Sequence, residues 1–111
     1  MCIVKMLQLS LSSGVEIHIG TSAAENTQLV RGKEPRFLWL HLHNRPSAHC
    51  VIQAVDPSRR DVVEAARALK ERSKLPCVRR TKVEVCALRH VHACEKEGEV
   101  ILSKQPDYVL V

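Results

Sequence analysis

Hydrophobic and polar residues alternate most regularly between residues 37 and 43, and this alternation predicts a β-strand with two different faces. One face carries three leucines, whereas the other carries four ring-bearing side chains, namely Phe37, Trp39, His41 and His43. A strand covered on one side normally places charged residues on its open side. This strand instead places there the single Trp of the chain and two of its six His, and His49 follows across a polar turn. We therefore take Trp39, His41 and His49 as a candidate functional cluster.

The remaining patterns predict a strand-rich chain with one principal helix and a short second helix. In chain order the expected elements are strands at 7–11 and 15–19, a helix at 23–30, strands at 37–43 and 49–55, a helix that starts at 56–58 and ends before Pro76, and strands at 82–91, 99–102 and 108–111. The turns at 12–14 and 104–107 predict hairpins between the strands that they join. We therefore expect an α+β fold with a mainly antiparallel sheet.

The start of the principal helix can be capped in two ways. Asp56 can cap it with Pro57 at the first helical position, or Ser58 can cap it with Asp61 closing a capping box. Four apolar residues at helical spacing are expected to form the inner face of this helix, namely Val62, Ala65, Ala66 and Leu69.

The composition is that of an ordinary globular domain. With 111 residues, of which 45% are hydrophobic and 26% charged, the chain is expected to form a single domain over residues 1–111. No apolar run is long enough to span a membrane, and the first residues do not resemble a secretory signal. The five cysteines include no C-x-x-C pair and are expected to be reduced thiols. These features predict a cytoplasmic protein, or one of an organelle matrix, without a membrane partner.

Positive charge is concentrated in one part of the chain. The formal net charge is +5, and basic side chains outnumber acidic ones between residues 67 and 89. Such a cluster attracts polyanions, and counterion release makes phosphate contacts the main source of sequence-independent affinity. The candidate phosphate contacts are Arg67, Arg72, Lys74, Arg79, Arg80, Lys82 and Arg89. The alternative is an ordinary charged surface that keeps the domain in solution.

An indole and two imidazoles can serve a nucleic-acid site directly, because such rings stack on bases and an imidazole N–H can donate to a phosphate oxygen. The alternative is that Trp39 fills one side of the sheet while His41 and His49 bond buried backbone carbonyls. Aromatic residues make up 3% of the chain, too few for a platform that stacks successive bases, so we expect binding through backbone charge and shape. Asn26 is expected to cap a local turn, the alternative being a hydrogen bond to a base.

Catalytic and metal chemistry receive little support from the sequence. Two sets of residues have possible metal-ligand spacing but lack the further cysteines of a closed structural site, namely His41, His43 and His49, and His90, His92 and Cys94. Cys50 beside His49 and Cys86 near His90 are possible nucleophile–base pairs, but no orienting carboxylate or oxyanion loop is indicated. We therefore expect a protein that is not an enzyme and holds no metal or cofactor.

A series of short segments resembles, in order and spacing, the sequence pattern of one known family. The segments lie at 12–20, 25–29, 39–41, 46–52, 65–74, 83–91 and 98–101, and include Trp39-Leu40-His41 and Pro46-Ser47-Ala48-His49. Together they resemble the NFACT-R domain, the presumed RNA-binding domain of NFACT proteins. That family includes ribosome quality control factors that add C-terminal tails to stalled nascent chains, and bacterial proteins once called fibronectin-binding. The chain departs from the family pattern at Thr27, Phe37 and Ser47.

The resemblance implies a non-catalytic RNA-binding domain that engages ribosomal RNA or tRNA, in translation or in ribosome-associated quality control. RNA is the expected partner, and the ribosome is a further candidate. Trp39, His41 and His49 are the residues that the resemblance assigns to the functional cluster. Two alternatives stay open: a protein-interaction or assembly module that docks its partner through the acidic tail and the edge strands, and a domain that binds duplex DNA.

Overall fold

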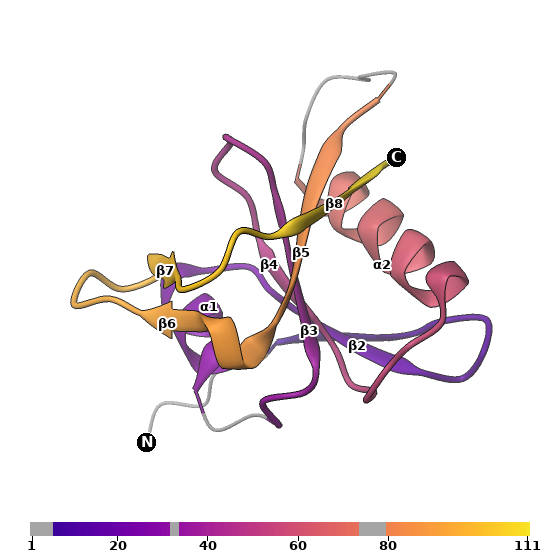
Figure 1. Ribbon diagram of the computed structural model, residues 1–111, viewed down its shortest axis with the longest axis horizontal. Coiled ribbons are helices and arrows are strands. Elements are labelled where there is room, and N and C mark those ends of the chain that lie inside the picture. The colour runs from indigo at the N-terminus through magenta and orange to yellow at the C-terminus, as the bar shows by residue number, and fades with distance from the viewer. Residues whose placement is uncertain (1–5, 32–33, 74–79) are drawn as a thin grey trace.

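The computed structural model describes residues 6–31, 34–73 and 80–111, and in this part of the chain two helices lie on opposite faces of an antiparallel sheet (Figure 1). The elements are β1 (Leu7–Ser10), β2 (Glu16–Gly20), α1 (Ala23–Val30), β3 (Leu38–Leu42), β4 (His49–Ile52), α2 (Arg59–Arg72), β5 (Lys82–Ala87), the 3₁₀ turn η1 (Leu88–His90), β6 (Val91–Ala93), β7 (Val100–Leu102) and β8 (Asp107–Leu110). Six strands form the main sheet in the order β1-β2-β4-β3-β5-β8, and β6 pairs separately with β7. The predicted α+β fold with a mainly antiparallel sheet is confirmed. No helix in the described ranges is long and apolar enough to cross a membrane.

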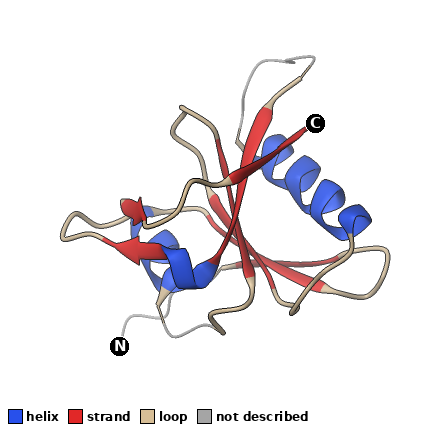
Figure 2. Ribbon diagram, viewed as in Figure 1, coloured by secondary structure: helices blue, strands red, loops and turns tan. Residues whose placement is uncertain are grey.

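Strand β3 lies between β4 and β5, and its two faces contribute to two different cores. Leu40 and Leu42 pack beneath α2 together with the expected inner face of that helix, namely Val62, Ala65, Ala66 and Leu69. On the opposite face Trp39 packs in a smaller core with Leu29 of α1 and with residues of β4, η1 and β6. Figure 2 shows the two helices separated by the strands of the sheet. The two faces predicted from the alternation are therefore confirmed.

Helix α2 begins with the second of its two possible caps. The Ser58 hydroxyl oxygen accepts from the Asp61 N–H at 3.1 Å, and an Asp61 carboxylate oxygen accepts from the Ser58 N–H at 3.3 Å. Asp61 also accepts from the Ser13 hydroxyl at 2.6 Å, which ties the start of α2 to the turn between β1 and β2. Asp56 has a φ of 57° and lies outside the helix, so it is not the cap.

Two predicted features of the C-terminal third are wrong. The expected strand at 82–91 is interrupted by η1, where the Leu88 N–H donates to the Phe37 carbonyl and the Arg89 N–H donates to the Pro35 carbonyl. Because the Leu88 side chain is buried in the smaller core, the chain turns there, so β5 stays in the main sheet and β6 leaves it. As a result β7 pairs with β6 and β8 pairs with β5, and the expected hairpin between 99–102 and 108–111 does not form.

The β6–β7 hairpin packs against the start of α1, and Gly98 is the point of contact. The Gly98 N–H donates to the Thr27 hydroxyl oxygen at 2.8 Å. Gly98 has a φ of +85°, and a Cβ at this position would lie 2.9 Å from the Ala23 Cβ. Both the left-handed backbone and the close approach therefore require glycine.

Gly98→Ala is expected to lower the free energy of unfolding by about 2 kcal/mol, because left-handed strain and the clash with α1 act together. Gly14→Ala is the matched control, since Gly14 also has a positive φ (+92°) but nothing lies within 4 Å of its Cβ position. In that control the free energy of unfolding should fall by about 1 kcal/mol. Urea denaturation measures both losses, and equal losses would contradict a tight contact between the hairpin and α1.

Candidate functional site

The sheet face that carries Trp39 is covered at one end and open at the other. Trp39 is 1% exposed in the smaller core, which includes residues of α1, β6 and β7. Two residues further along β3, His41 is partly exposed opposite its register partner Glu84 on β5. Beyond this pair the open end carries His43, Lys82 and Tyr108. The candidate site lies where the covered part of the face gives way to the open part.

Trp39 positions the two imidazoles of the predicted cluster. Its indole Nε1–H donates to His49 Nδ1 at 3.2 Å, and its ring is parallel to that of His41 with centroids 5.5 Å apart. The rings of His41 and His49 meet edge to face at a centroid distance of 4.9 Å. An indole N–H can only donate, so a neutral His49 keeps its proton on Nε2. Trp39 and His49 are both almost fully buried, at 1% and 3% exposed, whereas His41 is the partly exposed ring of the three.

A cleft of about 580 Å³ opens beside these rings, and we call it the histidine cleft. Its described lining includes His41, Pro46, Ser47, His49, Glu84 and Glu99. The volume lies within the range of small-molecule sites. Two carboxylates and two imidazoles reach the cleft, and none of its described lining residues is Lys or Arg.

Both imidazoles are neutral near pH 7. Burial lowers the pKa of His49 to about 4, and the neighbouring His41 acts in the same direction. Burial also lowers the pKa of His41, against the opposing effects of a backbone hydrogen bond with Leu42 and the charge of Glu84. The cleft therefore offers uncharged ring nitrogens beside carboxylate oxygens.

The lowered pKa of His49 predicts a loss of stability in mild acid. The unfolded chain protonates this imidazole near pH 6.5, whereas the folded domain does so near pH 4. The stability from the neutral ring is therefore complete above pH 6.5 and is lost as the pH falls towards 4. From about pH 7.5 to about pH 5 the expected loss from this group is about 2 kcal/mol.

Chemical denaturation at the two pH values tests this prediction. The loss should shrink in His49→Gln and persist in His92→Gln, whose native imidazole is exposed on β6. The same pH dependence in both variants and the unsubstituted protein would show that His49 does not remain neutral in the folded domain.

Asn26 and Ser47 hold the strand that carries His49. The Asn26 Oδ1 accepts from the His49 N–H at 3.1 Å. The Ser47 hydroxyl oxygen accepts from the Leu42 N–H at 3.2 Å, and the same hydroxyl donates to the Ala48 carbonyl at 2.8 Å. These two bonds fix the loop between β3 and β4. Asn26 lies inside α1, whose N-cap is Ser22, so the expected capping role of Asn26 is wrong.

The open end of this face brings together side chains from β5, β8 and the turn that follows β3. Lys82 Nζ lies 4.3 Å from the centroid of the Tyr108 ring, and His43 meets the same ring edge on at 5.1 Å. His43 Nδ1 also lies 3.0 Å from a Glu84 carboxylate oxygen. Lys82 was among the predicted nucleic-acid-binding residues, whereas His43, Glu84 and Tyr108 were not. The alternation that placed His43 on the face of His41 was an available signal, whereas nothing local indicated that β8 would pair with β5.

Three of the predicted phosphate contacts border the candidate site. Lys82 is the first residue of β5, and the exposed Arg80 precedes it by two residues. Arg72 is the last residue of α2 and lines a second cleft of about 880 Å³, which we call the arginine cleft. The described residues that define the arginine cleft include Thr21, Ser22, Asn26, Pro46, Ser47 and Arg72. Because Pro46 and Ser47 line both clefts, the two adjoin.

The other predicted phosphate contacts do not join this surface. Arg67 is exposed on α2, whose core-facing residues pack on the opposite face of the sheet, and it lines a separate hollow with Arg59 and Arg60. Arg89 lies in η1, at the opposite end of β5 from Lys82. Two further predicted contacts, Lys74 and Arg79, lie outside the described residues.

The residues considered for catalysis and metal binding are placed as follows. Cys50, next to His49, is buried, and burial raises the pKa of its thiol to about 12, so the thiol stays protonated. His90 lies in η1 and His92 in β6, so these two possible ligands lie in different elements. Within the described ranges, no group of three or more His, Cys, Asp or Glu is arranged to hold a metal ion.

Fold and site together define an α+β domain with a six-stranded antiparallel sheet and a cleft of mixed polar and apolar lining on the face opposite its principal helix. No family model and no curated protein matches the chain. Among solved structures, it is similar to the C-terminal part of the fibronectin/fibrinogen-binding protein from Streptococcus suis, with a TM-score of 0.91 and 22% sequence identity. The match covers 100% of this chain and 46% of that one, so the chain spans about half of its length. At this identity the likeness shows the fold alone.

Proposed function

We propose that this is a non-catalytic RNA-binding domain that engages ribosomal RNA or tRNA, in translation or in ribosome-associated quality control. The role is the one implied by the resemblance to the NFACT-R domain. One observation carries the proposal: the cleft lined by His41 and His49 adjoins an open surface that carries Lys82 and Tyr108, all on one face of the sheet. A nucleic-acid strand carries bases and phosphates side by side, so it requires a hydrogen-bonding cleft next to a positively charged surface.

The two parts of this face have different tasks in the proposal. Arg80 and Lys82 supply positive charge for phosphates, and Lys82 is held over the Tyr108 ring. The histidine cleft supplies hydrogen-bonding groups without positive charge, which suits an uncharged base more than a phosphate. With few aromatic rings on this face, most of the affinity is expected from charge and little from sequence.

Titration with labelled tRNA, single-stranded RNA and duplex DNA at two salt concentrations tests the proposal. RNA binding that weakens steeply with salt and exceeds duplex DNA binding would support it. Equal affinity for RNA and DNA would instead indicate a general nucleic-acid-binding domain. No binding at low salt would leave a protein-interaction module, for which the edge strand β8, with Leu110 54% exposed, is the first surface to examine.

A further inference from the structure

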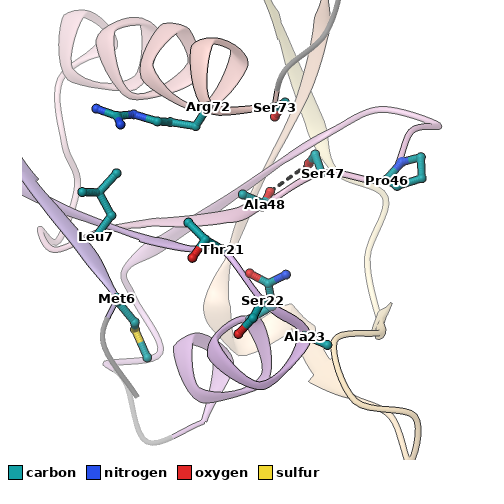
Figure 3. A pocket seen from close by; sticks show the side chains of 11 residues that line it. Met6, Leu7, Thr21, Ser22, Ala23, Pro46, Ser47, Ala48, Arg72 and Ser73 are labelled. Carbon is teal, nitrogen blue, oxygen red and sulfur yellow. Dashed lines mark hydrogen bonds between the residues drawn. The ribbon is translucent and has the colours of Figure 1, made fainter. Parts of the chain in front are cut away.

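The arginine cleft is lined by residues from three separate parts of the chain. Figure 3 shows Arg72 and Ser73 at the end of α2 across from Thr21 and Ser22 at the start of α1, with the loop before β4 along one side. None of its described lining residues is Asp or Glu. The cleft therefore carries the charge of Arg72 without a carboxylate on its described walls.

The hydrogen bonds that these residues already make leave donors free. A backbone N–H can only donate, so the bond from the His49 N–H fixes Asn26 Oδ1 as the acceptor and leaves the Asn26 amide N–H groups as donors. Asn26 is 9% exposed, and its amide nitrogen has no hydrogen-bond partner among the described residues. Thr81 Oγ1 is the one fully buried, unpaired side-chain polar atom of the described residues, so the Asn26 amide is not sealed from solvent.

The start of α1 adds to this set of donors. Ser22 caps the helix by accepting from the Glu25 N–H at 3.2 Å, and the first N–H groups of a helix have no partner within the helix. The Glu25 carboxylate accepts from the Thr21 N–H at 3.0 Å and is not among the described lining residues. An arginine, an amide and a helix start that all donate favour a ligand rich in acceptors and negative charge, such as a phosphate.

The histidine cleft has the opposite chemistry. Glu84 and Glu99 line it, and the neutral rings of His41 and His49 add no positive charge, so a phosphate is disfavoured there. One Glu84 oxygen binds His43, while the other lies 4.0 Å from His41 Nδ1, too far for a hydrogen bond, and so is free to accept. A planar, uncharged group with both donors and acceptors fits this lining, and a nucleobase is such a group.

The two clefts share the wall formed by Pro46 and Ser47, and Asn26 in one cleft bonds the backbone of His49 in the other. A ligand that fills both must therefore carry an anionic group and a planar uncharged group on one short connection. A nucleotide has this form, but a base-paired nucleotide keeps its base inside the helical stack.

We propose that the two clefts together hold one unpaired nucleotide of a nucleic-acid strand, with its base in the histidine cleft and its phosphate against Arg72 and Asn26. This inference rests on the proposed RNA-binding function and adds to it the single-stranded form of the ligand. The loop at Pro46 and Ser47 separates the base from the phosphate. Arg80 and Lys82 then contact the strand beyond the bound nucleotide.

Fluorescence anisotropy with three labelled probes tests the inference: a single-stranded RNA, the same RNA annealed to its complement, and a single-stranded DNA of the same sequence. The single-stranded RNA should bind about tenfold more tightly than the duplex. Arg72→Gln should weaken single-strand binding about tenfold and leave duplex binding unchanged. Arg36→Gln is the matched control, because Arg36 is exposed in the segment before β3 and lines neither cleft.

Each outcome separates this inference from the function on which it rests. Single-stranded RNA and DNA that bind equally, and both more tightly than the duplex, support an unpaired nucleotide in the clefts but replace the RNA-binding function with general nucleic-acid binding. Duplex RNA bound as tightly as the single strand, with Arg72→Gln without effect, overturns the inference while RNA binding stands. An absence of binding to all three probes overturns both. Thermal denaturation of both variants establishes that they are folded.

Discussion

Replacing Trp39 with alanine is expected to lower the free energy of unfolding by about 3–5 kcal/mol, a large share of the stability of a domain of this size. Trp39 is 1% exposed at the centre of the smaller core, and its removal leaves a cavity between the sheet, α1 and η1. The substitution also removes the donor to His49 Nδ1. Urea denaturation followed by far-ultraviolet circular dichroism measures the loss without relying on the deleted fluorophore.

Two further variants separate packing from hydrogen bonding at this position. Trp39→Phe keeps an aromatic ring but not the indole N–H. It should lower the free energy of unfolding by about 1–2 kcal/mol. Phe37→Ala is the control, because Phe37 lies on the same face but is half-buried at the edge of this core. If Trp39→Ala and Phe37→Ala lowered the free energy of unfolding by similar amounts, Trp39 would not be the central residue of the smaller core.

Reversing the charges of Arg80 and Lys82 to glutamate is expected to weaken tRNA binding about 100-fold at moderate salt. Lys82 lies at the open end of the face that carries the histidine cleft, and the exposed Arg80 precedes it by two residues. Loss of two phosphate contacts should also reduce the slope of log affinity against log salt by about 1.5. Titrations at several salt concentrations give both quantities.

The matched control is the double reversal of Arg36 and Arg89, which changes the net charge by the same amount. These two residues lie at the opposite end of the sheet, where Arg89 bonds the Pro35 carbonyl. The control should weaken tRNA binding through overall charge alone and therefore by much less. An equal effect of both double variants would mean that the net charge of the domain, rather than the position of Arg80 and Lys82, determines the affinity for tRNA.

Local patterns were sufficient to predict the elements that position the site. The alternation at 37–43 placed the leucines beneath α2 and the ring-bearing residues on the other face, because side-chain direction in a strand depends on the strand alone. The pairing of β8 was not predictable in this way, since a turn signal at 104–107 does not reveal that η1 has already separated β6 from β5. Tyr108 therefore entered the site unpredicted.

The positions of the positive charges on the folded surface were likewise not predictable from their spacing in the sequence. Arg67, Arg72, Lys82 and Arg89 are close in sequence but lie on different surfaces, because α2, β5 and η1 occupy different faces and ends of the sheet. Sequence distance predicts charge density along a chain, whereas a binding surface depends on tertiary contacts. The role of Asn26 depends on such a contact too, because its partner His49 is 23 positions away.

Nuclear magnetic resonance mapping of RNA binding tests the central claim most directly, because it reports on every face of the domain in one titration. Adding single-stranded RNA to isotope-labelled protein should shift the signals of His41, Ser47, Lys82 and Tyr108 most, and leave those of Arg59 and Arg67 on the outer surface of α2 nearly unchanged. If the largest shifts instead fell on α2, and the signals of His41 and Tyr108 did not change, RNA would not bind the face that carries the histidine cleft.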